Sequence, residues 1–294
     1  MVNSMKILSF GEILWDVYPD NKYIGGAPLN FAAHLSKHGE EVHMLSTVGE
    51  DDLGTEAIRL LNGWGVSSRF VSVLKNKKTG SCSVTLDKAS VPTYSLMRDV
   101  AYDFIPSDSV PNGFDALYFG TLALRGEYNF NSLKSLLKKC DFSEVFVDVN
   151  IRPPFYSEEV LYFSAENATV LKISLEELPI VAEALDISLL QGCYSDFAKN
   201  LAAEFTNLKC IIITLGGDGA YVLDCVSNTE LTCEAERVTV VSTVGAGDSF
   251  GAAFMHGYLH KNDLAVCLKY AVMVAGFVVS KAEAIPDYDL SDFT

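Results

Sequence analysis

Long hydrophobic runs and an excess of basic charge are both missing from this 294-residue chain. The longest late apolar run, residues 270–279, is far shorter than the ~20 residues of a membrane-spanning helix. Lys and Arg number 22 against 38 Asp and Glu, which gives a net charge of −16. Because such a surface repels phosphate backbones and anionic lipids, we expect neither a nucleic-acid nor a membrane partner. Any phosphate site needs its own local positive potential.

Paired cysteine motifs are also missing. The seven cysteines are scattered, odd in number and without a Cys-x-x-Cys pair, so the sequence indicates neither a disulfide framework nor a zinc site. The N-terminal apolar run is interrupted by Glu12, which is untypical of a signal peptide and predicts a first strand. Reduced thiols without a leader favour a cytoplasmic location.

The histidines do not form an evident ligand cluster. Two of the five are four residues apart on one predicted helix, but no third ligand lies near them in the sequence. All five are therefore predicted to be structural or exposed: His34, His38, His43, His256 and His260.

Strand-like and helix-like segments alternate along most of the chain, which predicts a mainly parallel central sheet covered by helices. The predicted strands are 5–13, 41–49, 116–124, 144–152, 168–174 and a pair within 210–224, and the predicted helices are 29–39, 52–65, 128–140, 175–184 and the run after residue 248. Residues 14–26 and 79–105 break the alternation and read as strands without helices. We expect them to form a small antiparallel sheet that acts as a lid on a single domain, residues 1–294.

Residues 242–259, "STVGAGDSFGAAFMHGYL", place three small residues before an acid at the mouth of a helix. Backbone N–H groups at a helix start lack intrahelical partners, and the helix dipole adds positive charge there. Gly245, Ala246 and Gly247 therefore suit an anion hole, and Asp248 suits a proton acceptor. A small-residue turn with a helix-stabilising Asp is the alternative interpretation.

"TVGAGDSF" resembles the C-terminal signature of the ribokinase-like (PfkB) sugar kinases, which usually reads Asp-Thr-x-Gly-Ala-Gly-Asp. The resemblance implies a three-layer α/β/α sandwich with a small β lid. It also implies that Asp248 is the catalytic base and that the amides of residues 245–247 form the anion hole.

The first third of the chain carries the same resemblance. "GGAPLNFAAHLSKHG" and "STVGEDDLG" are similar to the N-terminal signature of that family. Gly25, Gly26 and Asn30 then occupy sugar-binding positions, and Asp16 matches the acid that holds sugar hydroxyls.

Two further segments concern nucleotide and metal. In "LKISLEEL", Ser174 and Glu177 have the spacing of a helix capping box. The family has an Asn-x-x-Glu motif here that organises Mg²⁺ and its waters. In this chain Ser174 replaces the Asn and Glu177 keeps the acid, while the resemblance places the positive charge of Lys172 near ATP.

"LGGDG" predicts a hairpin turn between strands, which disfavours a dinucleotide site. The resemblance places three residues of this region near ribose and phosphates: Thr214, Gly216 and Gly219.

"DVNIRPP" resembles the fructokinase branch of the family. Asp148, Asn150 and Arg152 occupy alternate positions and would face one side of a strand end, where Asn150 and Arg152 are expected to bind the sugar. "MRDVAYD" resembles the fructokinase lid segment, in which an Arg contacts substrate. That role falls on Arg98, whose alternative interpretation is a solvated lid charge.

Ser242 departs from the family pattern, because an Asp that helps bind a monovalent cation usually stands there. Activation by K⁺ is therefore in doubt, whereas the base and the amides remain.

Together these motifs predict an ATP- and Mg²⁺-dependent kinase that converts D-fructose to fructose 6-phosphate. The same family offers other acceptors, namely 2-keto-3-deoxygluconate, ribose or a nucleoside. A non-catalytic sugar- or nucleotide-binding regulator and a nicotinamide-dependent oxidoreductase are alternatives from other classes. A homodimer through the lid is also expected, with Tyr94 and Tyr102 as contributors.

Overall fold

A central sheet of nine strands organises the computed structural model, which describes residues 4–86 and 92–293. The strand order is β13-β12-β11-β10-β9-β8-β1-β4-β5. The strands are β1 Lys6–Phe10, β4 Glu41–Gly49, β5 Ser67–Leu74, β8 Ala116–Gly120, β9 Glu144–Asp148, β10 Val170–Ser174, β11 Cys210–Thr214, β12 Ala220–Asp224 and β13 Thr229–Cys233. From β5 to β11 all neighbours are parallel, while β12 and β13 add an antiparallel edge. The predicted, mainly parallel sheet is confirmed.

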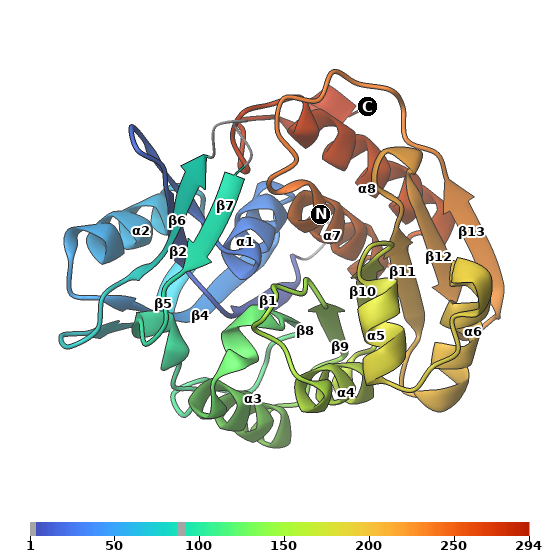
Figure 1. The fold of residues 1–294 in the computed structure, drawn as a ribbon, viewed down its shortest axis with the longest axis horizontal. Coiled ribbons are helices and arrows are strands. Elements are labelled where there is room, and N and C mark those ends of the chain that lie inside the picture. Colours follow the sequence, from blue (N-terminus) through green and yellow to red (C-terminus); the bar gives the residue numbers. More distant parts are fainter. Residues whose placement is uncertain (1–3, 87–91, 294) are drawn as a thin grey trace.

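Helices cover both faces of this sheet (Figure 1). They are α1 Ala27–Lys37, α2 Asp52–Gly63, α3 Glu127–Lys139, α4 Glu158–Asn167, α5 Leu178–Ala184, α6 Tyr194–Glu204, α7 Ala246–Leu259 and α8 Leu264–Val279. Side chains alternate along each strand, so Leu8 packs with α3–α6 and Ile7 with α1, α2, α7 and α8. The result is the predicted three-layer α/β/α sandwich.

Local signals set most helix boundaries. Pro28 stands in the first turn of α1, where its missing N–H costs no hydrogen bond, and the helix begins two residues earlier than predicted. Helix α5 begins at Leu178 instead of residue 175, because residues 175–177 form a turn first. Helices α4 and α6 were not predicted.

A second, four-stranded sheet lies beside the main one, in the order β3-β2-β6-β7. Its strands are β2 Leu14–Val17, β3 Lys22–Gly25, β6 Gly80–Leu86 and β7 Pro92–Leu96. The prediction of a purely antiparallel sheet is wrong, because β2 and β6 pair in parallel. Residues 97–105 are not strand but include a short 3-10 turn, Ala101–Asp103.

Tyr102 does not lie on the outer face of the small sheet. It is fully buried, and its ring packs under Gly80, where an added Cβ would lie 2.4 Å from the ring. The predicted contribution of Tyr102 to a dimer contact is therefore wrong, and the side chain of Tyr94 lies outside the described residues. Tyr23 and Met97 are exposed near this sheet. The homodimer itself stays a prediction.

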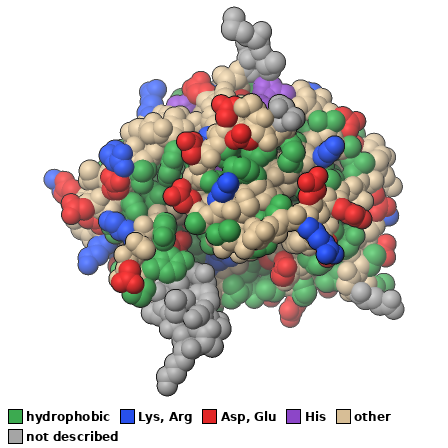
Figure 2. All heavy atoms as spheres, turned by 90° about the horizontal axis from the view of Figure 1, so that it is seen from above, with side chains coloured by type: hydrophobic (Ala, Val, Ile, Leu, Met, Phe, Trp, Pro, Cys, Tyr) green, Lys and Arg blue, Asp and Glu red, His purple; other side chains and the backbone are tan. Residues whose placement is uncertain are grey.

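Charge and apolar side chains are mixed on the surface. Figure 2 shows one face, on which acidic side chains lie among basic and apolar ones. Of the helices in residues 4–86 and 92–293, none has the length and apolar character that crossing a bilayer demands.

Asn129 joins the segment after the small sheet to the core. This fully buried side chain on α3 donates to the carbonyl oxygens of Tyr102 and Ala123, each at 2.7 Å. Its own carbonyl oxygen accepts the N–H of Ile105, also at 2.7 Å.

We predict that Asn129→Ala lowers the free energy of unfolding by at least about 3 kcal/mol, because it leaves three buried backbone groups unpaired at roughly 1–3 kcal/mol each. Urea denaturation measures the change. Asn131→Ala on the exposed side of the same helix is the control, and we expect it to stay within about 0.5 kcal/mol of wild type. Equal effects of the two substitutions would contradict the role given to Asn129.

Candidate active site

The carboxyl ends of the parallel strands meet the N-termini of α1 and α7 at one edge of the main sheet, where open α/β sheets bind ligands. Gly26 and Gly245 precede these two helices with φ angles of 111° and 80°. A Cβ on Gly245 would lie 2.6 Å from the carbonyl oxygen of Ala284. Only glycine fits both the backbone conformation and the space there.

Asp248 and Asn30 connect the two helices. The side-chain amide of Asn30 donates to Oδ2 of Asp248 at 2.8 Å, and both side chains are buried. Burial and the negative charge of Asp148 raise the pKa of Asp248 from 3.8 to about 6, against the lowering effect of the Asn30 hydrogen bond. This carboxylate is thus both oriented and able to take up a proton near neutral pH.

The N–H groups predicted to form an anion hole differ in their hydrogen bonding. Among the described residues, the N–H groups of Gly247 and Asp248 have no hydrogen-bond partner, as expected in the first turn of a helix. The N–H of Ala246 instead donates to the carbonyl oxygen of Thr243, at a long 3.3 Å. The N–H of Gly245 also has no partner among the described residues, so the free donors at this helix start are those of residues 245, 247 and 248.

Lys172 supplies positive charge directly below this helix start. Its ammonium donates to Oδ2 of Asp148 at 2.7 Å and lies 3.2 Å from where a Cβ on Gly247 would be. Burial alone would lower the pKa of Lys172, but Asp148 and other nearby carboxylates raise it above its usual value. Lys172 therefore stays charged although it is buried.

Glu177 lies at the same edge with its carboxylate turned inward. It accepts the N–H of Ile151 at 2.5 Å and that of Ser174 at 2.8 Å. The second bond is half of the predicted capping box, while the Ser174 side chain makes no cap. Burial and the charge of Asp148 raise the pKa of Glu177.

This carboxylate pair suits a magnesium ion. Oδ1 of Asp148 is buried and without a hydrogen-bond partner in the described part of the chain, and Glu177 is close enough to sense its charge. Hard oxygen donors of this kind hold Mg²⁺ together with several of its waters. The donor set therefore fits the predicted ion.

Asp16, Gly25 and Arg152 define a polar group on the small-sheet side. Asp16 pairs with Tyr23 and Cys82 in the sheet register, and a Cβ on Gly25 would approach Oδ2 of Asp16 to 3.2 Å. Burial raises the pKa of Asp16, and the nearby Arg152 opposes that shift. Arg152 itself forms no ion pair with any described residue.

Glu12 belongs to the site although the sequence interpretation did not include it. One oxygen accepts the N–H of Ala27 at 3.2 Å, and the other is buried without a partner in the described structure. Burial raises its pKa from 4.5 to about 7, and the charge of Asp248 adds to that effect. Its position directly after the first strand, at the carboxyl edge of the sheet, is the signal that could have found it.

Two predicted substrate residues are placed differently. Strand β9 ends at Asp148, and Asn150 has a φ of 40°, so Asp148, Asn150 and Arg152 do not alternate along one strand as predicted. Asn150 is half-buried, with no side-chain hydrogen bond to the described residues. Arg98 is exposed and stacks on the ring of Phe155 at 4.8 Å from its centroid.

Thr214, Gly216 and Gly219 form the turn between β11 and β12, and the predicted hairpin is confirmed. Gly216 and Gly219 have φ angles of 58° and 104°. Thr214 lies beside Ser174 in the sheet register, so this turn adjoins the strand end before Glu177. Ser242 is half-buried, and its hydroxyl accepts the N–H of Val244 at 3.2 Å.

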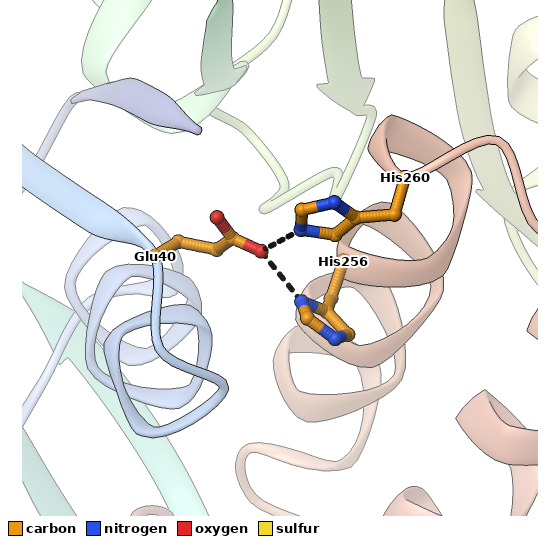
Figure 3. A group of neighbouring side chains, drawn as sticks. All are labelled: Glu40, His256 and His260. Carbon is orange, nitrogen blue, oxygen red and sulfur yellow. Dashed lines mark hydrogen bonds and ion pairs between the residues drawn. The ribbon is translucent and has the colours of Figure 1, made fainter. Parts of the chain in front are cut away.

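The predicted absence of a histidine cluster is wrong. Glu40 follows α1 in sequence, but the fold brings its carboxylate between His256 and His260 of α7 (Figure 3). The separation of 216 residues between Glu40 and His256 hid this third group from the sequence interpretation.

We predict that Glu12→Gln stabilises the protein at alkaline pH. Because the pKa of Glu12 is higher in the folded than in the unfolded state, wild-type stability falls as pH rises from about 4.5 to about 7. Gln removes this titration, so the variant should be more stable by about 3 kcal/mol at pH 8 and equal to wild type near pH 4.5.

Denaturant titrations at both pH values test this, with Glu166→Gln on the exposed side of α4 as the control. A pH-independent difference between Glu12→Gln and wild type would contradict the burial of an ionisable group at residue 12.

Known proteins with similar sequence and fold can be compared with this geometry. The 5-dehydro-2-deoxygluconokinase of Bacillus velezensis is 26% identical over 283 residues, which cover 90% of this chain and 83% of that protein. A probable fructokinase-5 of Arabidopsis thaliana is 26% identical over 279 residues, covering 87% and 83%. The crystal structure of an uncharacterized sugar kinase from Pyrococcus horikoshii has 25% identity and a TM-score of 0.79, covering 98% and 96%.

The pfkB family carbohydrate kinase domain matches residues 6–289. That range includes both sheets, both helix starts and every side chain of the site just described. The chain therefore belongs to the pfkB family of carbohydrate kinases.

Proposed function

We propose that this carbohydrate kinase transfers the γ-phosphoryl group of ATP to a primary hydroxyl of D-fructose, giving fructose 6-phosphate. The observation that carries the proposal is the placement of Asp248. Its side chain is buried and is oriented by the hydrogen bond from Asn30. It lies at the start of α7, where backbone N–H groups have no hydrogen-bond partner among the described residues. A base beside an anion site is the arrangement that phosphoryl transfer to a hydroxyl needs.

In the proposed step, Asp248 accepts the proton of the sugar hydroxyl while that oxygen attacks the γ-phosphorus in line. The new O–P bond forms as the bond from phosphorus to the leaving ADP oxygen breaks, and the proton stays on the carboxylate. The raised pKa of Asp248, about 6, matches this role, since a base works best when its pKa lies near the working pH.

The chain's own groups stabilise the charge on the phosphates. Lys172 lies directly beneath the start of α7, and the N–H groups of Gly247 and Asp248 point away from the helix body. Asp148 and Glu177 would hold Mg²⁺, which when bound neutralises phosphate charge. The turn with Thr214, Gly216 and Gly219 adjoins this edge and is proposed to receive the nucleotide.

The sugar is proposed to lie between Asp16, Asn30 and Arg152, under the small sheet. Gly25 and Gly26 keep the backbone close to that space, since a Cβ on Gly26 would lie 2.4 Å from the carbonyl oxygen of Glu12. Closure of the small sheet as a lid would exclude water, which otherwise competes with the sugar as phosphoryl acceptor. With a Ser at position 242, we expect no requirement for K⁺.

A sugar acid is the second candidate acceptor. Arg98 and Arg152 carry no ion pair to the described residues, so two guanidinium groups on the sugar side are available to a carboxylate. The name of the Bacillus velezensis relative refers to a deoxygluconate, which is a sugar acid. The relative named as a probable fructokinase agrees with the first candidate instead.

Removal of the proposed base tests the mechanism. We predict that Asp248→Asn lowers kcat by ~10²–10⁴-fold, because it removes general-base catalysis while leaving a similar shape. In wild type, kcat/KM should fall tenfold per pH unit below about pH 6, where Asp248 takes up a proton. ADP release followed from pH 5 to 9 measures both.

Calorimetric titration of the Asn variant with the sugar is the control, and the affinity should change little. Full turnover by Asp248→Asn would contradict the mechanism.

The acceptor is tested with a panel of fructose, 2-keto-3-deoxygluconate, ribose, glucose and nucleosides, with and without K⁺. We predict the highest kcat/KM for fructose and less than a twofold effect of K⁺. Arg152→Gln should then raise KM for fructose more than it lowers kcat, since it loses sugar contacts made before the transfer step.

A preference for the sugar acid would mean that Arg98 and Arg152 bind its carboxylate. Arg98→Gln would then weaken binding of the sugar acid more than binding of fructose. Nucleotide binding without turnover on any acceptor would favour a regulator. Tight NAD binding would favour an oxidoreductase.

A further inference from the structure

Glu40, His256 and His260 form a compact cluster away from the site already described. His256 Nδ1 lies 2.6 Å and His260 Nε2 lies 2.7 Å from the same oxygen, Oε1 of Glu40. Figure 3 shows both rings on one side of the end of α7, turned toward the carboxylate. The three ligand atoms all lie within 4.8 Å of one another.

The carboxylate of Glu40 is fixed in a buried position. Its side chain is 1% exposed, and its other oxygen accepts the N–H of Met5 at 2.6 Å. Burial would raise its pKa, but the hydrogen bonds from His256, Met5 and His260 outweigh that effect and lower it. Within the described residues no Lys or Arg pairs with this charge, so the two imidazoles and the Met5 N–H are the groups that stabilise it.

We propose that this cluster is a structural binding site for a divalent transition-metal ion of the Zn²⁺ type. Two imidazole nitrogens and one carboxylate oxygen are a donor set that Zn²⁺ accepts, and a water completes four-coordination. Histidines four residues apart on a helix present their rings on one face, as in known zinc motifs. The His256 and His260 side chains are 28% and 14% exposed, which leaves an approach for the ion and the water.

Receiving the ion requires the ligand atoms to shift: the two N–O distances open, and the two imidazole nitrogens, which lie within 4.8 Å of each other, close toward the separation that the ion sets. Ligand bonds of ~2.0–2.1 Å in a tetrahedron separate the ligand atoms by about 3.3 Å. The two N–O distances would therefore open by roughly 0.6 Å as the ion replaces the protons shared with Glu40. His260 is the capping residue directly after α7, and helix ends are the positions most free to move.

An ion bound to this cluster would connect two helices of the core, α1 and α7. Glu40 lies just after the C-terminal end of α1, and both histidines lie at the C-terminal end of α7. Asn30 and Asp248 join the same two helices at their N-terminal ends. Asp248 and His256 are eight residues apart, about 12 Å along the helix, so the ion would hold α1 and α7 together without touching the reacting groups.

The test is a calorimetric titration of the full chain with Zn²⁺. Excess Mg²⁺ is present to compete for the carboxylates of the candidate active site, and a non-chelating reductant keeps the cysteines reduced. We expect one Zn²⁺ per chain in wild type. His256→Gln and His260→Gln should each weaken Zn²⁺ binding by at least ~10–100-fold. Losing a residue that only hydrogen-bonds a metal ligand already costs that much, and these variants lose a ligand itself.

His43→Gln is the matched control. His43 also contacts a glutamate, Glu41, at 2.8 Å, but it is not in the three-residue group, so its loss should leave Zn²⁺ affinity unchanged. The melting temperature of wild type should rise with Zn²⁺, and that of either cluster variant should not.

Absorption of the Co²⁺-substituted wild type gives an answer even if a variant does not fold. Nitrogen and oxygen ligation without thiolate charge-transfer bands supports the site, whereas thiolate bands would place the ion on cysteines and overturn it. Failure of wild type to bind Zn²⁺, or binding that survives both substitutions, would also overturn it. None of these measurements depends on kinase activity, so failure of the proposed function leaves them interpretable.

Discussion

The buried ion pair between Lys172 and Asp148 is the interaction on which the candidate active-site edge of the sheet depends. Four carboxyl groups with little exposure meet there, on Glu12, Asp148, Glu177 and Asp248, and Lys172 is the buried cation among them. Pairing with Asp148 keeps Lys172 charged beneath the start of α7. A buried pair contributes little net stability, but removal of one partner leaves an uncompensated charge and costs about 3–5 kcal/mol. Its importance is that it places a positive charge next to the proposed anion site in a chain whose net charge is −16.

That excess of buried acid explains why three of these carboxyls have raised pKa values. Burial is the main cause in Glu12, Glu177 and Asp248, and the negative charge of a neighbour adds to it in each. Hydrogen bonds and positive charge from the proposed sugar, nucleotide and cation would stabilise the ionised forms of these carboxyls. The carboxyl groups whose burial is costly to the folded protein are therefore the groups that ligands would stabilise. Such a cost to stability in exchange for function is usual at active sites.

The sequence predicts the layers well because the signals for them are local. Short apolar strands such as β9, and helices such as α3 whose apolar residues recur every three or four positions, need only nearby residues to be recognised. The parallel pairing of β2 with β6 could not be predicted, because it joins segments more than 60 residues apart. Tyr102 was misplaced for a related reason: the segment after β7 turns into the core, where Asn129 of α3 holds it. Tertiary contacts decided both cases.

The same distinction between local and distant contacts decides which residues of the candidate site can be predicted from the sequence. The glycine-rich starts of α1 and α7 are legible in the sequence, since each is a short motif with its own backbone requirement. Glu40 is not, since its contacts with His256 and His260 join residues more than 200 positions apart. Glu12 lies in between: its place after the first strand is a local signal, whereas its interaction with Asp248 is distant. Both of these acids border the contact between α1 and α7. That contact is fixed at one end by Asn30 and Asp248 and at the other by the Glu40 carboxylate between two imidazoles, so the orientation of α7 is set from both of its ends.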